Sequence, residues 1–117
     1  MGAFHVGCRV DNHVDRSRSV RIPKLLVDTA SEHTWRPAAL LEEIGVRREK
    51  KDLRFIVANG DVVARRVGFA VVRVEKNFTI DDVVFAEPGD LIPLGVRTLE
   101  GLNLAVDADQ SRRTKRV

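Results

Sequence analysis

Short apolar runs separated by turn residues recur along the whole chain, and this pattern predicts a domain built mainly from strands. Val is abundant in these runs while aromatic residues are few, which favours a sheet over a helical bundle. Strands are expected at residues 4–10, 20–27, 53–58, 61–75, 78–86 and 103–107. The consecutive apolar residues Leu25, Leu26 and Val27 indicate that the second strand is covered on both faces. Pro23, which cannot donate a ladder hydrogen bond, predicts that this strand lies at an edge or begins with a bulge.

Two turn signals separate the later strands. Asn59-Gly60 is the strongest short hairpin signal, because both of its turn positions must accept positive φ. It predicts that the strands on either side of it form one long hairpin. Glu87-Pro88-Gly89 predicts a second turn, directly after the strand at 78–86.

Two short helices are expected between the strands. The segment Thr34-Trp35-Arg36-Pro37 is predicted to begin the first helix, with Pro37 suited to the first turn and Gly45 to the end. The second is predicted over about 96–102. No repeat, linker or low-complexity segment divides the chain. We therefore expect one mostly β domain over residues 1–117, folded as a closed or nearly closed barrel.

The composition is that of a folded globular domain. The chain has 117 residues, of which 44% are apolar and 32% charged. Its apolar runs are too short to span a bilayer, and its N-terminus lacks the basic start and apolar run of a signal peptide. The single Cys8 cannot form an internal disulfide, which suits a reducing compartment. We therefore expect a cytoplasmic protein with no membrane partner.

The net charge of +3 is spread unevenly, in two basic clusters. The first consists of Arg47, Arg48, Lys50 and Lys51, and the second of Arg112, Arg113, Lys115 and Arg116. Such clusters can bind phosphate backbones, so one alternative is a small basic β-barrel that binds nucleic acid. No aromatic interleaving or nucleic-acid motif accompanies them. We therefore expect solvated surface and a frayed terminus, with no nucleic-acid partner.

The run from Lys24 to Ser31 carries the most informative candidate chemistry. It delivers one carboxylate, Asp28, from an apolar strand into a turn of small and hydroxyl-bearing residues. Near low dielectric an ionised carboxylate is costly unless it is hydrogen-bonded, so its acidity can be tuned for acid or base catalysis. The alternative is an Asp that caps a turn after a core strand. The residues of this run leave both interpretations open.

Three elements follow in order along the chain: Asp28-Thr29-Ala30-Ser31 after an apolar strand, the hairpin tip at Asn59-Gly60, and Pro93-Leu94-Gly95-Val96-Arg97-Thr98-Leu99 before a short helix. This order resembles the retropepsin-like aspartic proteases of clan AA, a single-domain family that includes retroviral proteases and their cellular and bacterial relatives. The resemblance covers about residues 4–107 and leaves a basic tail at 108–117 outside. It implies an all-β fold of the retropepsin (acid protease) type, a small closed barrel with two short helices that forms a homodimer.

The resemblance also implies an aspartic endopeptidase. Family members supply one Asp per chain and pair two chains about a twofold axis, so Asp28 would be the catalytic residue of each chain. Two carboxylates a few ångströms apart cannot both ionise freely and therefore share a proton. One acts as general base on a water molecule, while the other polarises the scissile carbonyl of an extended peptide or protein substrate. No cofactor is implied, and no metal site is expected, because His5, His13 and His33 share no metal-ligand spacing.

The positions that match the family's motifs imply further roles. Thr29 would bond across the dimer axis and, with Ala30, lock the two active loops together. The residues implied to bind substrate are Ser31, Glu32, His33, Trp35, Asn59 and Gly60, of which the last two form the tip of a flap. Leu94 and Gly95 would form the structural motif before the last helix. The alternatives are Thr29 as an ordinary turn hydroxyl, Trp35 as core, His33 as surface, Asn59-Gly60 as a plain turn and Gly95 as a site of close helix packing.

Ala30 departs from the family pattern, which has Gly at this position. Gly permits backbone angles that a Cβ penalises, and it allows close approach of neighbouring chains. If the position needs positive φ, Ala would cost on the order of 1 kcal/mol or more. The alternative function is therefore a catalytically impaired module that keeps the protease fold and binds peptides.

Overall fold

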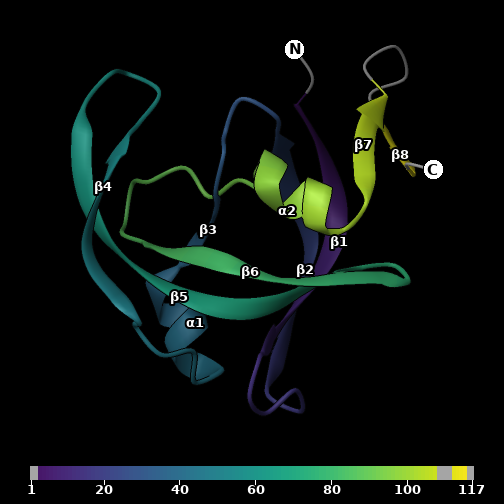
Figure 1. Cartoon of the computed structure of the whole chain (residues 1–117), viewed down its shortest axis with the longest axis horizontal. Coiled ribbons are helices and arrows are strands. Elements are labelled where there is room, and N and C mark those ends of the chain that lie inside the picture. The colour runs from purple at the N-terminus through teal and green to yellow at the C-terminus, as the bar shows by residue number, and fades with distance from the viewer. Residues whose placement is uncertain (1–2, 108–111, 116–117) are drawn as a thin grey trace.

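The computed structural model describes residues 3–107 and 112–115, with side chains described from residue 5 to residue 104. The strands are β1 (Ala3–Asn12), β2 (Ser19–Asp28), β3 (Thr34–Pro37), β4 (Lys50–Ile56), β5 (Val62–Val74), β6 (Asn77–Ala86), β7 (Leu104–Asp107) and β8 (Arg112–Lys115). The helices are α1 (Ala38–Glu43) and α2 (Val96–Gly101) (Figure 1). The mostly β character and the two short helices expected from the sequence are confirmed.

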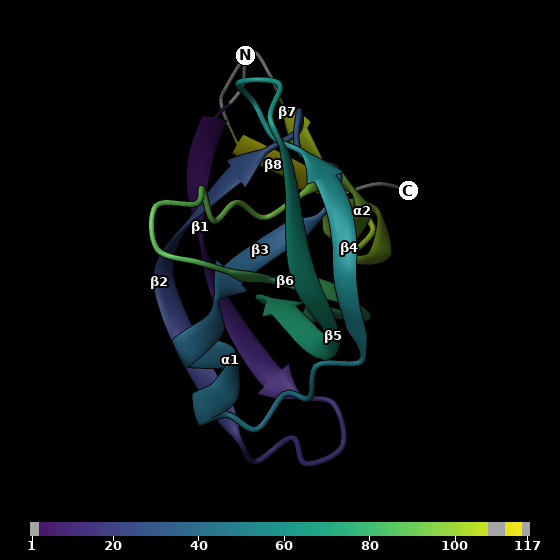
Figure 2. The same cartoon turned by 90° about the vertical axis from the view of Figure 1, so that its left-hand side faces the viewer.

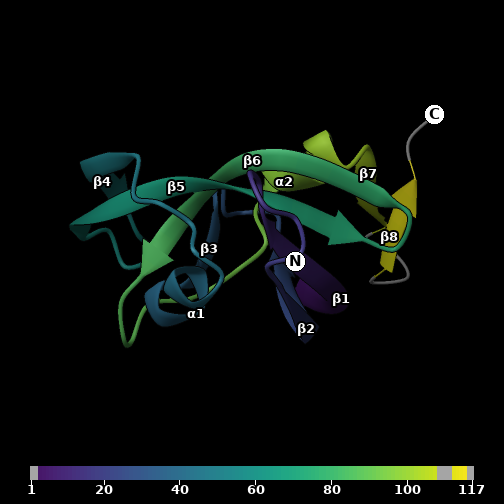
Figure 3. The ribbon, with the colours of Figure 1, turned by 90° about the horizontal axis from the view of Figure 1, so that it is seen from below.

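The main sheet has the strand order β2-β1-β5-β6-β3, and β4 pairs with β5 in addition. Strand β5 is 13 residues long and pairs with β4 through its first half and with β1 through its second. Only β3 and β6 pair in parallel within this sheet. Figure 3 shows β5 and β6 as two long, curved strands that run side by side. The length of β5 thus joins the hairpin with β4 to the rest of the sheet.

The sheet does not close, so the expectation of a closed barrel is wrong. Its two end strands are β2 and β3, and the segment Pro93-Leu94 lies between them. Leu94 N donates to Leu26 O in β2 (2.7 Å), and Trp35 N in β3 donates to Pro93 O (2.9 Å). Val27 and Leu94 form only an isolated parallel bridge. Two residues, one of them a proline without an N–H, cannot form the continuous strand that closure would need.

The main apolar core lies between the inner face of the sheet and both helices. From β5 the alternating residues Ala70, Val72 and Val74 face this core, as strand periodicity requires. Helix α1 contributes Leu41 and α2 contributes Leu99. A second, smaller cluster on the other face consists of Trp35, Val67, Val84 and Ala86. The sheet is therefore covered partly on both faces.

Strand β2 lies at an edge of the sheet, as Pro23 predicted. The register between β1 and β2 shifts between the pairs Val6↔Leu25 and Cys8↔Ile22, which places a bulge at the proline. Leu25 is buried, whereas Leu26 is only half-buried. The expected covering of both faces of this strand is therefore incomplete.

Residues Thr34–Pro37 form strand β3, so the predicted start of the first helix is wrong. They pair in parallel register with Val83–Ala86 of β6. Arg36 precedes a proline, a position that disfavours helical backbone, and Pro37 becomes the N-cap residue of α1. Gly45 follows the helix with a φ of +76°, which agrees with the predicted stop.

The predicted hairpin of β4 and β5 is confirmed, but its loop has three residues instead of two. Gly60 N donates to Val57 O (2.8 Å), and Val57 N donates to Asp61 O (2.9 Å). Gly60 has a φ of +91°, whereas Asn59 is outside the left-handed region. A type I turn followed by one left-handed residue gives this loop, so a single positive φ is enough. Figure 2 shows the hairpin facing the viewer, with its tip at the upper end.

Part of the basic tail is ordered, so the expectation of a frayed terminus is wrong for residues 112–115. They form β8, which pairs antiparallel with β7 in a separate two-stranded sheet. The tail residues 108–111 and 116–117 lie outside the described residues. In the described part of the chain, neither helix is long and apolar enough to cross a membrane.

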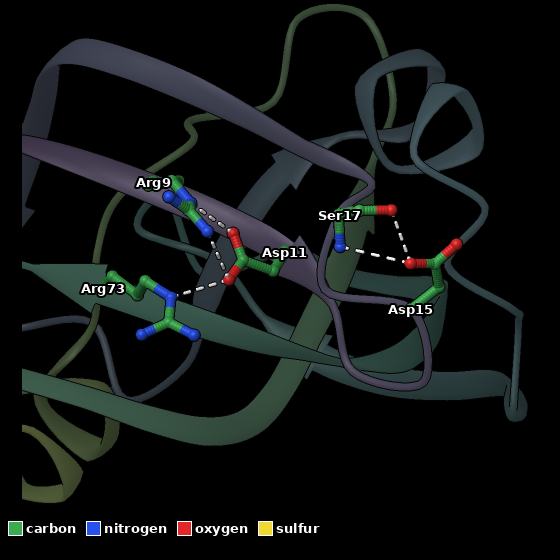
Figure 4. A network of polar contacts seen from close by, with 5 residues as sticks. All are labelled: Arg9, Asp11, Asp15, Ser17 and Arg73. Carbon is green, nitrogen blue, oxygen red and sulfur yellow. Dashed lines mark hydrogen bonds and ion pairs between the residues drawn. The ribbon is translucent and has the colours of Figure 1, made fainter.

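A buried carboxylate joins β1 to β5 (Figure 4). The Asp11 side chain is fully buried and accepts hydrogen bonds from Arg9 Nε (2.7 Å) and Arg73 Nε (2.6 Å). Burial alone would raise the pKa of Asp11, but the hydrogen bonds and charges of the two arginines outweigh it and lower that pKa. The network fixes the pairing of β1 with β5, away from the candidate site.

Candidate active site

Asp28 is the last residue of β2, and its own loop orients its carboxylate. Asp28 Oδ1 accepts a hydrogen bond from Ala30 N (2.9 Å), and Asp28 O accepts one from Ser31 N (3.0 Å). The backbone N–H of Asp28 donates to Leu94 O (3.1 Å). The side chain is half-buried at the end of an apolar strand. The structure therefore presents this carboxylate from a tight turn that is anchored on a distant segment.

Leu94 and Gly95 lie directly beneath the Asp28 loop. A Cβ at Gly95 would overlap the backbone carbonyl groups of His33 and Glu32, so only glycine fits. At the start of α2, Val96 N donates to Ser31 O (2.8 Å). This arrangement agrees with the reading of Gly95 as a site of close packing. The same contacts hold the loop that carries Asp28, because the start of α2 donates hydrogen bonds to Ser31 O and Glu32 O.

Two buried threonines support this segment, and the sequence interpretation missed them. Thr34 Oγ1 and Thr98 Oγ1 are 2.6 Å apart, and Gly95 N donates to Thr34 Oγ1 (2.9 Å). Thr98 Oγ1 also donates to Asp81 Oδ2 (3.0 Å). No local sequence signal marks this pair, because each threonine has a basic residue on one side (His33 and Arg97) and an apolar residue on the other (Trp35 and Leu99).

A groove of about 1030 Å³ begins beside the Asp28 loop and continues under the β4–β5 hairpin. Of the predicted site residues, six line it: Ala30, Ser31, Glu32, His33, Trp35 and Asn59. Asp28 and Thr29 immediately precede this lining, Gly60 lies just beyond it, and Leu94 and Gly95 lie beneath the loop. The lining residues that the sequence interpretation missed are residues 53–58, 61, 63, 89–91 and 93. A sequence signal existed only for β4, where the apolar residues Leu53 and Phe55 alternate with charged residues on a hairpin strand.

Three rings meet at one wall of the groove. Phe55 of β4 makes edge contacts with His33 (ring centroids 5.2 Å apart) and with Trp35 (5.3 Å). Trp35 is only 7% exposed and also belongs to the smaller apolar cluster, so it is both core and groove wall. His33 is not a simple surface residue, because it lines the groove and its Nε2 lies 3.3 Å from Arg97 Nη1. The wall is therefore largely aromatic and apolar.

An ion pair between Arg65 and Asp90 joins strand β5 of the hairpin to the turn after β6. The Arg65 guanidinium of β5 donates to both carboxylate oxygens of Asp90. Asp90 N donates to Glu87 O (3.0 Å), and Gly89 has a φ of +92°, so the predicted turn at Glu87-Pro88-Gly89 is confirmed. The hydrogen bond from Arg65 holds the pKa of Asp90 below its usual value, against the opposing effect of burial. Two walls of the groove are thus fixed relative to each other.

Thr29 and Ala30 are both exposed in the single chain. Among the described residues, the non-glycine positions with positive φ are Asp52, Glu75 and Asn103. Ala30 therefore adopts this loop without the backbone penalty that a left-handed conformation would impose on it. In this structure the departure from glycine therefore imposes no positive-φ strain.

The comparison with known proteins agrees with this geometry. A family model described as aspartyl protease matches residues 13–106, a range that includes Asp28, the groove and Gly95. Among curated proteins, no sequence matches the chain. The family match covers most of the chain, and the matched range contains the Asp28 loop, the β4–β5 hairpin and the start of α2. The chain therefore belongs to the retropepsin-like aspartyl proteases.

Proposed function

We propose that the chain is an aspartic endopeptidase that works as a homodimer. The observation that carries the proposal is the placement of Asp28, whose carboxylate is held by Ala30 N (2.9 Å) next to a groove of about 1030 Å³. Membership of the aspartyl protease family supports hydrolysis of a peptide bond as the reaction. An oriented carboxylate beside a groove that suits an extended chain is what such a reaction needs.

The proposed reaction uses the Asp28 residues of two chains. Because two adjacent carboxylates cannot both ionise freely, the pair holds one proton between them. The ionised partner takes a proton from a water molecule, whose oxygen attacks the scissile carbonyl carbon. The protonated partner donates its hydrogen to the carbonyl oxygen. Collapse of the tetrahedral intermediate breaks the C–N bond. The leaving amine takes up the proton held by the pair, and one hydroxyl of the intermediate returns its proton to the pair as the carboxyl product forms.

The need for a second chain follows from counting carboxylates, since each chain supplies one Asp28 loop. The exposure of Thr29 and Ala30 supports a contact between the two loops, in which Thr29 would bond across the twofold axis. Ser31, Glu32 and His33 would then contact the backbone of an extended peptide. The loop Ala58–Gly60 would close over it as a flap, in the manner of an added strand.

Cleavage of unfolded casein by the purified protein tests this proposal. We expect hydrolysis that pepstatin inhibits and that Asp28→Asn lowers by about 10²- to 10⁴-fold, since the general base is lost. The matched control is Asp15→Asn, which removes the same charge from the β1–β2 turn, where Asp15 accepts hydrogen bonds from Ser17 (Figure 4). Wild-type turnover in Asp28→Asn would overturn the proposal.

Mixing the wild-type and Asp28→Asn proteins tests the dimer directly. If each active site needs one Asp28 from each chain, mixed dimers are inactive. After exchange at equal concentrations, activity should fall to about half of that of the same amount of wild-type protein diluted with buffer. Unchanged activity, or a monomer by sedimentation at working concentration, would contradict a shared site.

A further inference from the structure

A chain of hydrogen bonds runs from the backbone beneath the active loop to a carboxylate on β6. Gly95 N donates to Thr34 Oγ1 (2.9 Å), Thr34 Oγ1 lies 2.6 Å from Thr98 Oγ1, and Thr98 Oγ1 donates to Asp81 Oδ2 (3.0 Å). Thr34 and Thr98 are 1% and 0% exposed, and Asp81 is half-buried. The chain links three elements, because β3, α2 and β6 each contribute one side chain.

The direction of this chain is fixed by its last member. A carboxylate only accepts hydrogen bonds, so the single hydroxyl proton of Thr98 is donated to Asp81. Thr98 Oγ1 must then accept the proton of Thr34, and Thr34 Oγ1 is left to accept from Gly95 N. The other oxygen of the carboxylate, Asp81 Oδ1, accepts from Asp82 N (2.8 Å). Every donor in the chain therefore has one defined acceptor.

The Gly95 end of the chain bears directly on Asp28. Gly95 packs without a Cβ against the carbonyl groups of His33 and Glu32, and Leu94 O accepts the hydrogen bond of Asp28 N (3.1 Å). A displacement of this backbone would thus move the loop that orients the carboxylate. Hydrogen bonds connected in a row polarise one another, so each of them is strengthened.

We infer that Asp81 is a positioning residue for the Asp28 loop and acts through Thr98 and Thr34 on the Leu94-Gly95 segment. This inference rests on the proposed peptidase function and adds a residue to its machinery that touches no substrate. Without the carboxylate, the hydroxyl protons of the two threonines lose their fixed direction, and the acceptor for Gly95 N is no longer assured. The catalytic loop then samples other positions, and misplacement of a catalytic group by about 1 Å can cost up to 100-fold in rate.

The test compares substitutions that break the chain with substitutions that keep it. Asp81→Ala and Thr98→Val should each lower kcat for casein cleavage by about 10-fold with little change in KM. They should also speed hydrogen exchange of the Gly95 amide by about 10-fold relative to amides in the middle of β5, as the loss of one hydrogen bond predicts. Asp81→Asn and Thr98→Ser retain an acceptor and a hydroxyl, respectively, and should restore both quantities.

Asp82→Ala is the matched control. Asp82 is the next residue on β6 and carries the same charge, but its side chain lies 3.4 Å from Lys50 Nζ on the other face of the strand. We expect wild-type kcat and Gly95 exchange for this variant. Equal losses in Asp82→Ala, or an unchanged Gly95 exchange rate in both Asp81→Ala and Thr98→Val, would overturn the inference.

The two readouts separate this inference from the proposed function. If the wild-type protein cleaves no peptide, the proposed function fails. Hydrogen exchange of the Gly95 amide still decides whether the hydrogen bonds from Asp81 through Thr98 and Thr34 hold the Leu94-Gly95 segment. If cleavage depends on Asp28 but not on Asp81, the function stands and the positioning role is wrong. Thr98→Val, which keeps nearly the same shape as Thr, gives the same decision should Asp81→Ala fail to fold.

Discussion

Arg65 and Asp90 form a two-pronged ion pair at the wall of the groove, with Nε–Oδ2 at 2.7 Å and Nη2–Oδ1 at 2.8 Å. The two side chains are only 12% and 14% exposed. The pair fastens the β4–β5 hairpin, which is proposed to cover substrate, to the turn that follows β6. Its geometry makes it the strongest candidate for a pH-dependent element of the site.

Asp90→Asn should lower the free energy of unfolding at pH 7 by about 1 kcal/mol, because a planar two-bonded ion pair is lost. The pKa of Asp90 is depressed in the folded state, so its stabilisation is complete above the unfolded pKa of about 3.9. The stabilisation is lost as the pH falls through the lower, folded pKa. Urea denaturation of the wild type and of Asp90→Asn measures this effect. The difference between their free energies of unfolding should be smaller at pH 3 and below than at pH 7.

Glu87→Gln is the control for this prediction. Glu87 Oε1 lies 3.7 Å from Arg65 Nη1, and the Glu87 side chain is 62% exposed, so its loss should change stability little. A difference between wild type and Asp90→Asn that stays constant over the whole pH range would contradict the assignment to ionised Asp90.

Ala30→Gly should not raise activity, since Ala30 occupies its loop without a positive φ. The substitution instead adds conformational freedom to the unfolded chain and should lower the free energy of unfolding by about 0.4–1 kcal/mol. Chemical denaturation and kcat/KM on casein measure the two effects. A rise in turnover of tenfold or more would show that the methyl group impairs catalysis, and the impaired peptide-binding module would then be the better description.

Gly95→Ala should destabilise the protein by about 1–3 kcal/mol and reduce cleavage, because the new methyl group overlaps the His33 carbonyl. Gly7→Ala is the comparison, since a Cβ there meets only Pro23 O at an ordinary 3.6 Å. In thermal unfolding, the Tm of Gly95→Ala should be clearly lower than that of Gly7→Ala. Equal stability of the two variants would mean that the Leu94-Gly95 segment moves away from the active loop without cost.

Arg36→Leu should stabilise the protein by about 1–3 kcal/mol, the cost of leaving buried donors without acceptors. Arg36 is 3% exposed, and its Nε and Nη1 have no hydrogen-bond partner among the described residues. Burial lowers the pKa of Arg36, and burial also raises the pKa of nearby Cys8 to about 12, so this thiol supplies no negative charge.

Arg21→Leu, on the exposed side of β2, is the control for the Arg36 substitution and should stay within about 0.5 kcal/mol of wild type. Urea midpoints of the two variants give the comparison. Destabilisation by Arg36→Leu would show that the guanidinium makes a favourable interaction that replaces a hydrogen bond.

Six of the strands, the hairpin and the motif around Asp28 could be predicted because their signals lie in adjacent residues, whereas β3 and β8 were not predicted. Val-rich runs, Pro23 and Gly60 each act on their own stretch of backbone. The bond between Thr34 and Thr98 joins residues 64 positions apart, and the Arg65–Asp90 pair joins residues 25 apart. Neither leaves a periodic pattern, so only the fold could bring them together. The family resemblance predicted a closed barrel, because it could not show that Pro93-Leu94 takes the place of a strand.

The opening between β2 and β3 has a consequence for the stability of the proposed site. Asp28 ends one of these strands, Trp35 lies in the other, and the connection through Pro93-Leu94 rests on a few backbone hydrogen bonds instead of a full ladder. Local separation of β2 from β3 would move the Asp28 carboxylate away from the groove wall at Trp35, while β1, β5 and β6 stay paired. If the chain is the proposed peptidase, we expect activity to be lost before global unfolding, on heating or in mild denaturant. We also expect a peptide substrate bound across β2 and β3 to raise the temperature at which they separate.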